Sequence, residues 1–185
     1  IQRAIMNCDR ETGISIMKIV HKLDAGPVLL KSKIKISKEI NYGELSKQMS
    51  KLGAKLTLDA LELIKNNKAK FIPQNDEEAT YAKKIEKAES KINWNMDAKI
   101  VVAKINALYP NPGAWLLLKG QRIKVIKAIE VNIKGEPGKI INKNFTIGCL
   151  NNAVQILELK KEGKNKISTE EFLRGNKLKV GTNIG

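Results

Sequence analysis

The segment Leu23-Asp24-Ala25-Gly26 is the place in the sequence where side chains best support chemistry. An Ile- and Val-rich run precedes it, so we expect a strand that leads into a tight turn with Asp24 at its head. A carboxylate held in a turn can accept a proton, orient a histidine or bind a water molecule. Gly26 permits a positive φ angle or the close approach of a ligand. The same residues also suit an ordinary hairpin turn, in which the aspartate accepts backbone N–H bonds.

Basic side chains form the second candidate site. The chain of 185 residues holds 34 Lys and Arg against 19 Asp and Glu, which gives a formal net charge of +15. Between residues 119 and 143, seven basic side chains accompany only two acidic ones. Four of the seven are candidates for contact with a nucleic-acid backbone: Lys119, Arg122, Lys124 and Lys127. A solvated basic surface with no partner is the alternative interpretation of this charge.

Several classes of protein are excluded by what the sequence lacks. The longest apolar run, residues 114–118, is far shorter than the roughly 20 residues of a membrane span, so we expect no membrane contact. Cys8 and Cys149 lie far apart with no histidine near either, so we expect no metal site and no disulfide framework. Free thiols and the lack of a secretory pattern favour a cytoplasmic protein. We expect a monomer.

The elements that must position these residues fall into an α/β part followed by a β part. Residues 1–70 predict strands at 13–20 and 28–36 and a helix that runs from Asn41, with Glu44 as its capping-box partner, to about Asn66. Residues 71–92 are polar and include Pro73, which predicts a linker. Residues 93–185 predict a helix at 96–108, five short strands, and a last helix opened by a capping box at Ser168. Five short strands favour a small OB-like β-barrel over an open sheet.

The turn motif carries a family resemblance. Gly13-x-Ser15-Ile16 followed by Leu23-Asp24-x-Gly26 resembles the active-site signature of the folate-dependent formyltransferases, although Lys18, Ile19 and His21 depart from the usual pattern. Further segments resemble the methionyl-tRNA formyltransferases within that family. They follow one another over essentially the whole chain, at residues 1–3, 9–13, 80–85, 88–94 and 110–115.

The resemblance implies both a fold and a reaction. Residues 1–70 would be the C-terminal part of a Rossmann-like formyltransferase catalytic domain, and residues 93–185 an OB-like tRNA-binding domain. The implied reaction moves a formyl group from 10-formyltetrahydrofolate to the α-amine of initiator methionyl-tRNA, with no metal. Asp24 would be catalytic, and Leu23 and Gly26 would lie against the folate cofactor.

The resemblance also implies that part of the catalytic machinery is missing from this chain. The family's catalytic Asn and His match no residue here, because His21, the single histidine, lies on the wrong side of the motif. We expect both to lie upstream of Ile1, so the 185 residues alone should be inactive, since one oxyanion donor alone is worth about 10²–10³ in rate. Two alternatives stay open. One is a related formyltransferase or hydrolase with another acceptor, and the other is a non-catalytic basic module that binds nucleic acid.

Overall fold

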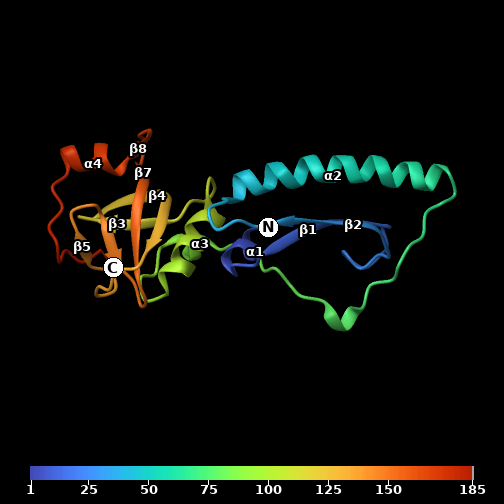
Figure 1. Cartoon of the computed structure of the whole chain (residues 1–185), viewed down its shortest axis with the longest axis horizontal. Helices are drawn as coiled ribbons and strands as arrows, with labels where there is room; N and C mark the ends of the chain where they lie inside the picture. The colour runs from blue at the N-terminus through green and yellow to red at the C-terminus, as the bar shows by residue number, and fades with distance from the viewer. Residues whose placement is uncertain (185) are drawn as a thin grey trace.

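The computed structural model describes residues 1–184, which form two parts side by side along the long axis of the molecule (Figure 1). The first part contains α1 (Gln2–Met6), β1 (Glu11–Met17), β2 (Val28–Lys35) and α2 (Tyr42–Lys65). The second part contains α3 (Ala98–Leu108), a six-stranded sheet and α4 (Thr169–Gly175). Two short 3₁₀ helices, η1 (Asp76–Glu78) and η2 (Lys87–Ser90), lie in the segment that joins the parts.

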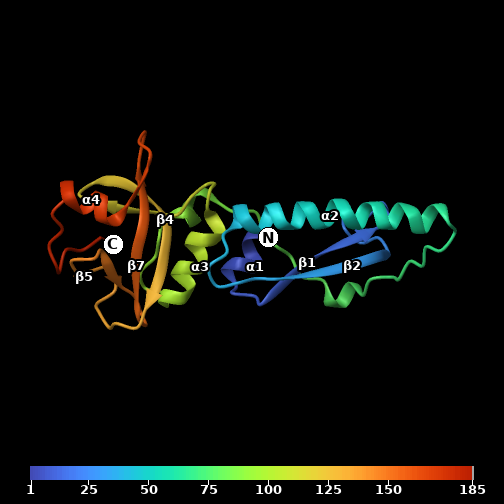
Figure 2. The same cartoon turned by 45° about the horizontal axis from the view of Figure 1, so that its top comes forward.

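Strands β1 and β2 pair as an antiparallel hairpin, and α2 lies along it (Figures 1 and 2). Thr12, Ile14 and Ile16 of β1 are less exposed than the residues between them, as expected for a strand covered on one face. The Asn41 side chain accepts a hydrogen bond from the Glu44 N–H at 3.0 Å, and the Glu44 carboxylate accepts one from the Asn41 N–H at 3.3 Å. This capping box confirms the helix start predicted from the sequence.

The second part is built on one antiparallel sheet in the order β3-β4-β7-β6-β5, with β8 also paired to β7. Its core contains Val125, Ile156, Leu159 and the stacked rings of Phe145 and Phe172, whose centres lie 5.8 Å apart. Val125, Ile156 and Leu159 alternate with less buried residues along β4 and β7, so one face of the sheet faces the core. The strands are β3 (Trp115–Leu118), β4 (Gln121–Val131), β5 (Ile140–Asn142), β6 (Thr146–Gly148), β7 (Ala153–Lys161) and β8 (Lys166–Ser168).

The expected closed OB-like barrel is not confirmed, because no pairing within residues 1–184 joins β3 to β5. Each outer strand is paired with an irregular segment instead. The Ile92 N–H donates to the Trp115 carbonyl of β3 at 2.8 Å. On β5, Ile140 exchanges hydrogen bonds with Thr182 and Gly181 at 2.9 and 2.8 Å. Segments from the two ends of the second part therefore occupy the backbone groups that barrel closure would need.

Contacts distant in sequence hold the two parts together. Ile5 of α1, Leu45 of α2 and Ala107 of α3 share a small buried cluster. The Arg3 guanidinium forms a two-pronged ion pair with Glu89 at 2.6 and 2.9 Å. Helix α1 packs against both α2 of the first part and α3 of the second. The division into residues 1–70, 71–92 and 93–185 therefore stays a prediction.

Candidate functional site

The loop that joins β1 to β2 carries Asp24 and has a tightly constrained backbone. The Lys18 N–H donates to the Pro27 carbonyl at 3.0 Å, which closes the loop at its base. Asp24 has a φ of 54°, a left-handed conformation that aspartate tolerates better than most residues. Gly26 serves a different need, because a Cβ atom there would lie 1.7 Å from the Lys18 carbonyl oxygen. Glycine is therefore required at position 26 because the backbone of Lys18 lies so close. The residue with the positive φ in this loop is Asp24.

Residues 72–76 hold this loop in place from the segment that follows α2. The Gln74 side-chain amide donates to the carbonyl of Asp24 at 2.9 Å and to that of Gly26 at 2.7 Å. Ile72 and Val28 exchange two backbone hydrogen bonds, of 2.8 and 2.9 Å. Gln74 was not among the sequence candidates, and no local pattern marks it, because its partners lie about 50 residues earlier.

The Asp24 carboxylate is exposed and makes no hydrogen bond or ion pair with the residues that the structure describes. Leu23 beside it is 88% exposed, which is unusual for leucine. His21, three residues earlier, is also exposed. The turn therefore presents a free carboxylate and an apolar side chain outward, and its own backbone groups are paired inward.

The basic candidates Arg122 and Lys124 lie on the outer face of β4, opposite the core. Lys124 is paired in register with Trp115 of β3 and with Lys160 of β7, and Lys160 is paired with Lys166 of β8. Register partners share a face, so the three lysines form a row across the sheet. The Arg122 guanidinium lies 4.4 Å from the centre of the Trp115 ring, within the range of a cation–π interaction.

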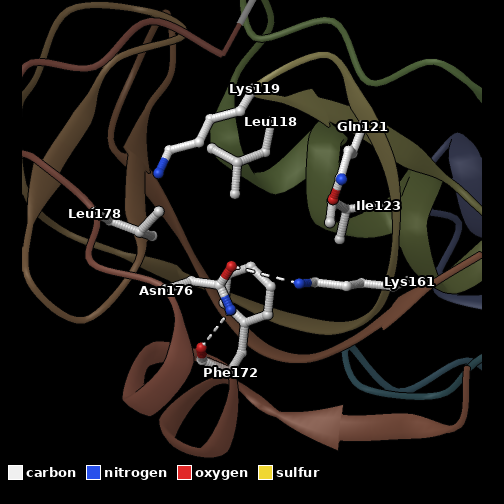
Figure 3. Close-up of a pocket in the computed structure, with 8 residues that line it drawn as sticks. All are labelled: Leu118, Lys119, Gln121, Ile123, Lys161, Phe172, Asn176 and Leu178. Carbon is white, nitrogen blue, oxygen red and sulfur yellow. Dashed lines mark hydrogen bonds between the residues drawn. The ribbon is translucent and has the colours of Figure 1, made fainter.

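Lys119 and Lys127 are not register partners of that row, so the four basic candidates do not form one row. Lys119 occupies the two-residue turn between β3 and β4 and lines a small pocket at the end of the sheet (Figure 3). Lys127 lines a cleft of about 460 Å³ between the two parts of the molecule, together with the carboxylates of Glu39, Glu44 and Glu158. Lys166 of the row lines the same cleft and donates to Glu158 at 3.2 Å. A lysine among carboxylates is a poorer phosphate contact than one in a row of cations.

The turn and the lysine row also lie far from each other. The loop between β1 and β2 is at one end of the molecule, and the second part is at the other (Figures 1 and 2). A ligand that reaches both must be a large molecule.

No metal or membrane feature is found among the described residues. Residues 1–184 contain no group of three or more His, Cys, Asp or Glu side chains that could hold a metal ion. Burial raises the pKa of the Cys149 thiol to about 12, which keeps it protonated and a poor metal ligand. None of the helices in this part of the chain is long and apolar enough to cross a membrane.

The chain thus combines an antiparallel hairpin that carries an aspartate turn with a separate antiparallel sheet that carries basic side chains. Residues 1–61 match the family model "Formyl transferase", and residues 84–177 match "Formyl transferase, C-terminal domain". The chain belongs to the formyl transferase family.

Two curated relatives are similar to this chain over almost its whole length. The methionyl-tRNA formyltransferase of Pelagibacter ubique is 42% identical over 185 residues, which are 100% of this chain and 60% of that protein. The methionyl-tRNA formyltransferase of Dictyoglomus turgidum is 43% identical over 189 residues, covering 98% of this chain and 60% of that protein. The chain therefore spans about 60% of the length of these relatives.

The fold resembles that of a solved structure. HypX from Aquifex aeolicus, in complex with tetrahydrofolic acid, superposes with a TM-score of 0.70 at 23% identity. The match covers 98% of this chain and 35% of that one. At this identity the likeness concerns the fold alone.

Proposed function

We propose that this chain belongs to an enzyme that transfers a formyl group from 10-formyltetrahydrofolate to the α-amine of initiator methionyl-tRNA. The observation that carries the proposal is identity of 42% and 43%, over essentially the whole chain, to two methionyl-tRNA formyltransferases. The tetrahydrofolic acid bound by HypX supports the choice of formyl donor. In this proposal residues 93–184 form an OB-like tRNA-binding unit, and the protein is a cytoplasmic monomer.

Asp24 is the proposed catalytic residue of this chain. In the reaction the amine nitrogen bonds to the formyl carbon, the bond from that carbon to the folate nitrogen breaks, and the proton that the amine loses replaces the formyl group on the folate nitrogen. An exposed carboxylate on a fixed turn can orient a histidine that takes this proton, or hold the water that relays it. Because no described side chain bonds the Asp24 carboxylate, the relay needs a partner from outside residues 1–184, and this chain alone should be inactive. Leu23 and Gly26 belong to the same turn as Asp24 and would contact the folate.

The test of this role is Asp24→Asn in a version of the protein completed with the part that its relatives have and this chain does not span. Asparagine keeps the shape of the side chain but cannot take a proton, so kcat should fall by roughly 10²–10⁴. Asp59→Asn, on the exposed side of α2, is the matched control and should keep its turnover. Near-normal turnover of Asp24→Asn would return Asp24 to the role of a turn residue.

The lysine row is the proposed contact with the tRNA backbone, and it would position the tRNA without reading its sequence. Lys124 packs closely on Gly113, since a Cβ there would lie 3.2 Å from the Lys124 Cδ atom. Arg122 belongs to the same face. Lys119 and Lys127 stay candidates, but their neighbours differ, and we expect Lys127 to contribute least.

Salt titration of tRNA binding tests this assignment. Removal of one phosphate contact by Lys124→Ala should reduce the slope of log affinity against log salt by about 0.7–0.9. Lys127→Ala should change the slope less, and Lys51→Ala on exposed α2 should not change it. A response to Lys124→Ala that equals the response to Lys51→Ala would reject the row as a tRNA contact. It would leave the basic charge as a solvated surface.

A non-catalytic nucleic-acid module is the second candidate. It is favoured by one observation, the separation of the lysine row from the Asp24 loop along the molecule (Figure 1). The Asp24→Asn experiment separates the two candidates, because a non-catalytic module has no turnover for this substitution to reduce.

A further inference from the structure

A pocket of about 220 Å³ lies in the second part, on the face of β4 and β7 opposite the lysine row (Figure 3). It is bounded by the β3–β4 turn, the end of β7, α4 and the residues that follow α4. Its lining combines four apolar side chains with two amides and two lysines, and it includes no carboxylate: Leu118, Lys119, Gln121, Ile123, Lys161, Phe172, Asn176 and Leu178.

Lys161 is held in the pocket by neutral partners. It is the last residue of β7 and follows the alternation of Leu159, so its side chain lies on the core face. Its Nζ atom lies 5.1 Å from the centre of the Phe172 ring and donates to the Asn176 Oδ1 atom at 3.4 Å. The Asn176 amide in turn donates to the Phe172 carbonyl at 2.9 Å. A cation–π contact and an amide oxygen orient the ammonium group without neutralising it.

Lys119 supplies a second cation from the opposite side of the pocket, and Figure 3 shows its side chain reaching in from the β3–β4 turn. Its φ of 50° and the φ of 76° at Gly120 define a tight hairpin turn with both central residues left-handed. Neither Lys119 nor Lys161 forms an ion pair with any residue between 1 and 184.

The walls strengthen the attraction of these two charges for an anion. Leu118, Ile123 and Phe172 are 5%, 1% and 1% exposed, so they form an apolar base beneath the two lysines. Charges interact more strongly beside such a base than in open water. The Gln121 amide at the rim adds N–H donors. The volume is below the roughly 300–1,000 Å³ of pockets for drug-sized ligands, which limits the occupant to a small group.

We propose that this pocket binds a single phosphate group between the Lys119 and Lys161 ammonium groups. A phosphate has several oxygens, so it can accept from both lysines and from Gln121 at once. Two sources share this chemistry: a phosphodiester of bound RNA and a small free phosphate compound. The RNA source rests on the proposed function, whereas the phosphate site itself does not.

The experiment follows the side-chain amide signals of Gln121 and Asn176 by NMR in the 185-residue chain at constant ionic strength. One arm adds pyrophosphate, and the other adds a short single-stranded RNA that lacks terminal phosphates. Saturable shifts of these signals are expected in at least one arm. Lys161→Gln and Lys119→Gln should each weaken that binding roughly tenfold or more, the expected loss of one charge-assisted hydrogen bond.

Lys164→Gln is the control, since Lys164 lies in the exposed turn after β7 and does not line the pocket. It should bind like the wild type. Shifts with RNA identify the phosphodiester as the source, and shifts with pyrophosphate alone identify a free phosphate. Because Lys119 is exposed in a turn, Lys119→Gln should fold normally and keeps the test valid even if Lys161→Gln does not fold. The proposal is overturned if neither probe gives saturable shifts, or if the folded pocket variants bind as Lys164→Gln does.

Discussion

Replacement of Gly26 by alanine should open the Asp24 loop. The new Cβ would lie 1.7 Å from the Lys18 oxygen and 2.9 Å from its carbon, so the two backbone segments must separate by more than about 1 Å. That movement breaks the bond from the Lys18 N–H to Pro27 and the bond from Gln74 to Gly26. Two hydrogen bonds at about 1 kcal/mol each and a further 1 kcal/mol of residual overpacking give a total of about 3 kcal/mol.

Amide hydrogen exchange measures this effect where it occurs. A loss of about 3 kcal/mol in the free energy of opening should speed exchange of the Lys18 N–H by roughly 100-fold. Two other glycines separate the causes. Gly175→Ala meets no atom within 4 Å and has an ordinary φ, so it should change nothing. A Cβ on Gly120 would also meet no atom within 4 Å, but Gly120 has a φ of 76°. Gly120→Ala should therefore lower the free energy of opening by only about 1–2 kcal/mol, and only at the β3–β4 turn. Wild-type exchange at Lys18 in Gly26→Ala would refute the argument from close approach.

Three further outcomes are expected. The Arg3 hydrogen bonds lower the pKa of Glu89 to about 2, so their stabilisation is complete above about pH 4.5 and is lost as the pH falls towards 2. Urea unfolding of Glu89→Gln should show a smaller loss over that window, and an unchanged pH dependence would contradict it. Cys8 should react with iodoacetamide at pH 8 in the folded protein while buried Cys149, with its pKa of about 12, does not, and equal labelling would show otherwise. Gln74→Ala should speed exchange in the Asp24 loop by roughly tenfold through loss of two partly exposed hydrogen bonds, whereas exchange at the wild-type rate would deny Gln74 that role.

The elements that the sequence predicted well are those with local signals. The capping box at Asn41 and the N-cap at Ser168 mark the starts of α2 and α4, because each cap and its partner lie three residues apart. The reciprocal half of the box expected at Ser168 is not formed. Strand β8 was missed, since Lys166-Ile167-Ser168 is too short and polar to show alternation. Barrel closure is not confirmed, for a similar reason. It depends on how residues 91–92 and 181–183 pair at the sheet edges, and no local pattern encodes that pairing.

The candidate sites also differ in whether a local sequence pattern could reveal them. The Leu-Asp-x-Gly turn could be read from the sequence, although the left-handed φ belongs to Asp24 and not to Gly26. The register of β7 against β4 and β8 decides that Lys160 and Lys166 join Lys124, and register is not visible in composition. The same register pairs Lys161 with Ile123 and so places Lys161 on the pocket side of the sheet. Sequence reasoning found the type of charge and missed its grouping.

The segment between the two parts has a consequence for how the chain tolerates being cut. Every residue from 70 to 84 is exposed, which is the condition under which proteases find a site. Residues before this stretch contact residues after it: Arg3 forms an ion pair with Glu89, and Ile5 and Leu45 are buried against Ala107. A single nick there would divide the covalent chain without removing these contacts. The two pieces should therefore remain associated and could be made separately and combined, as a split protein whose halves recognise each other.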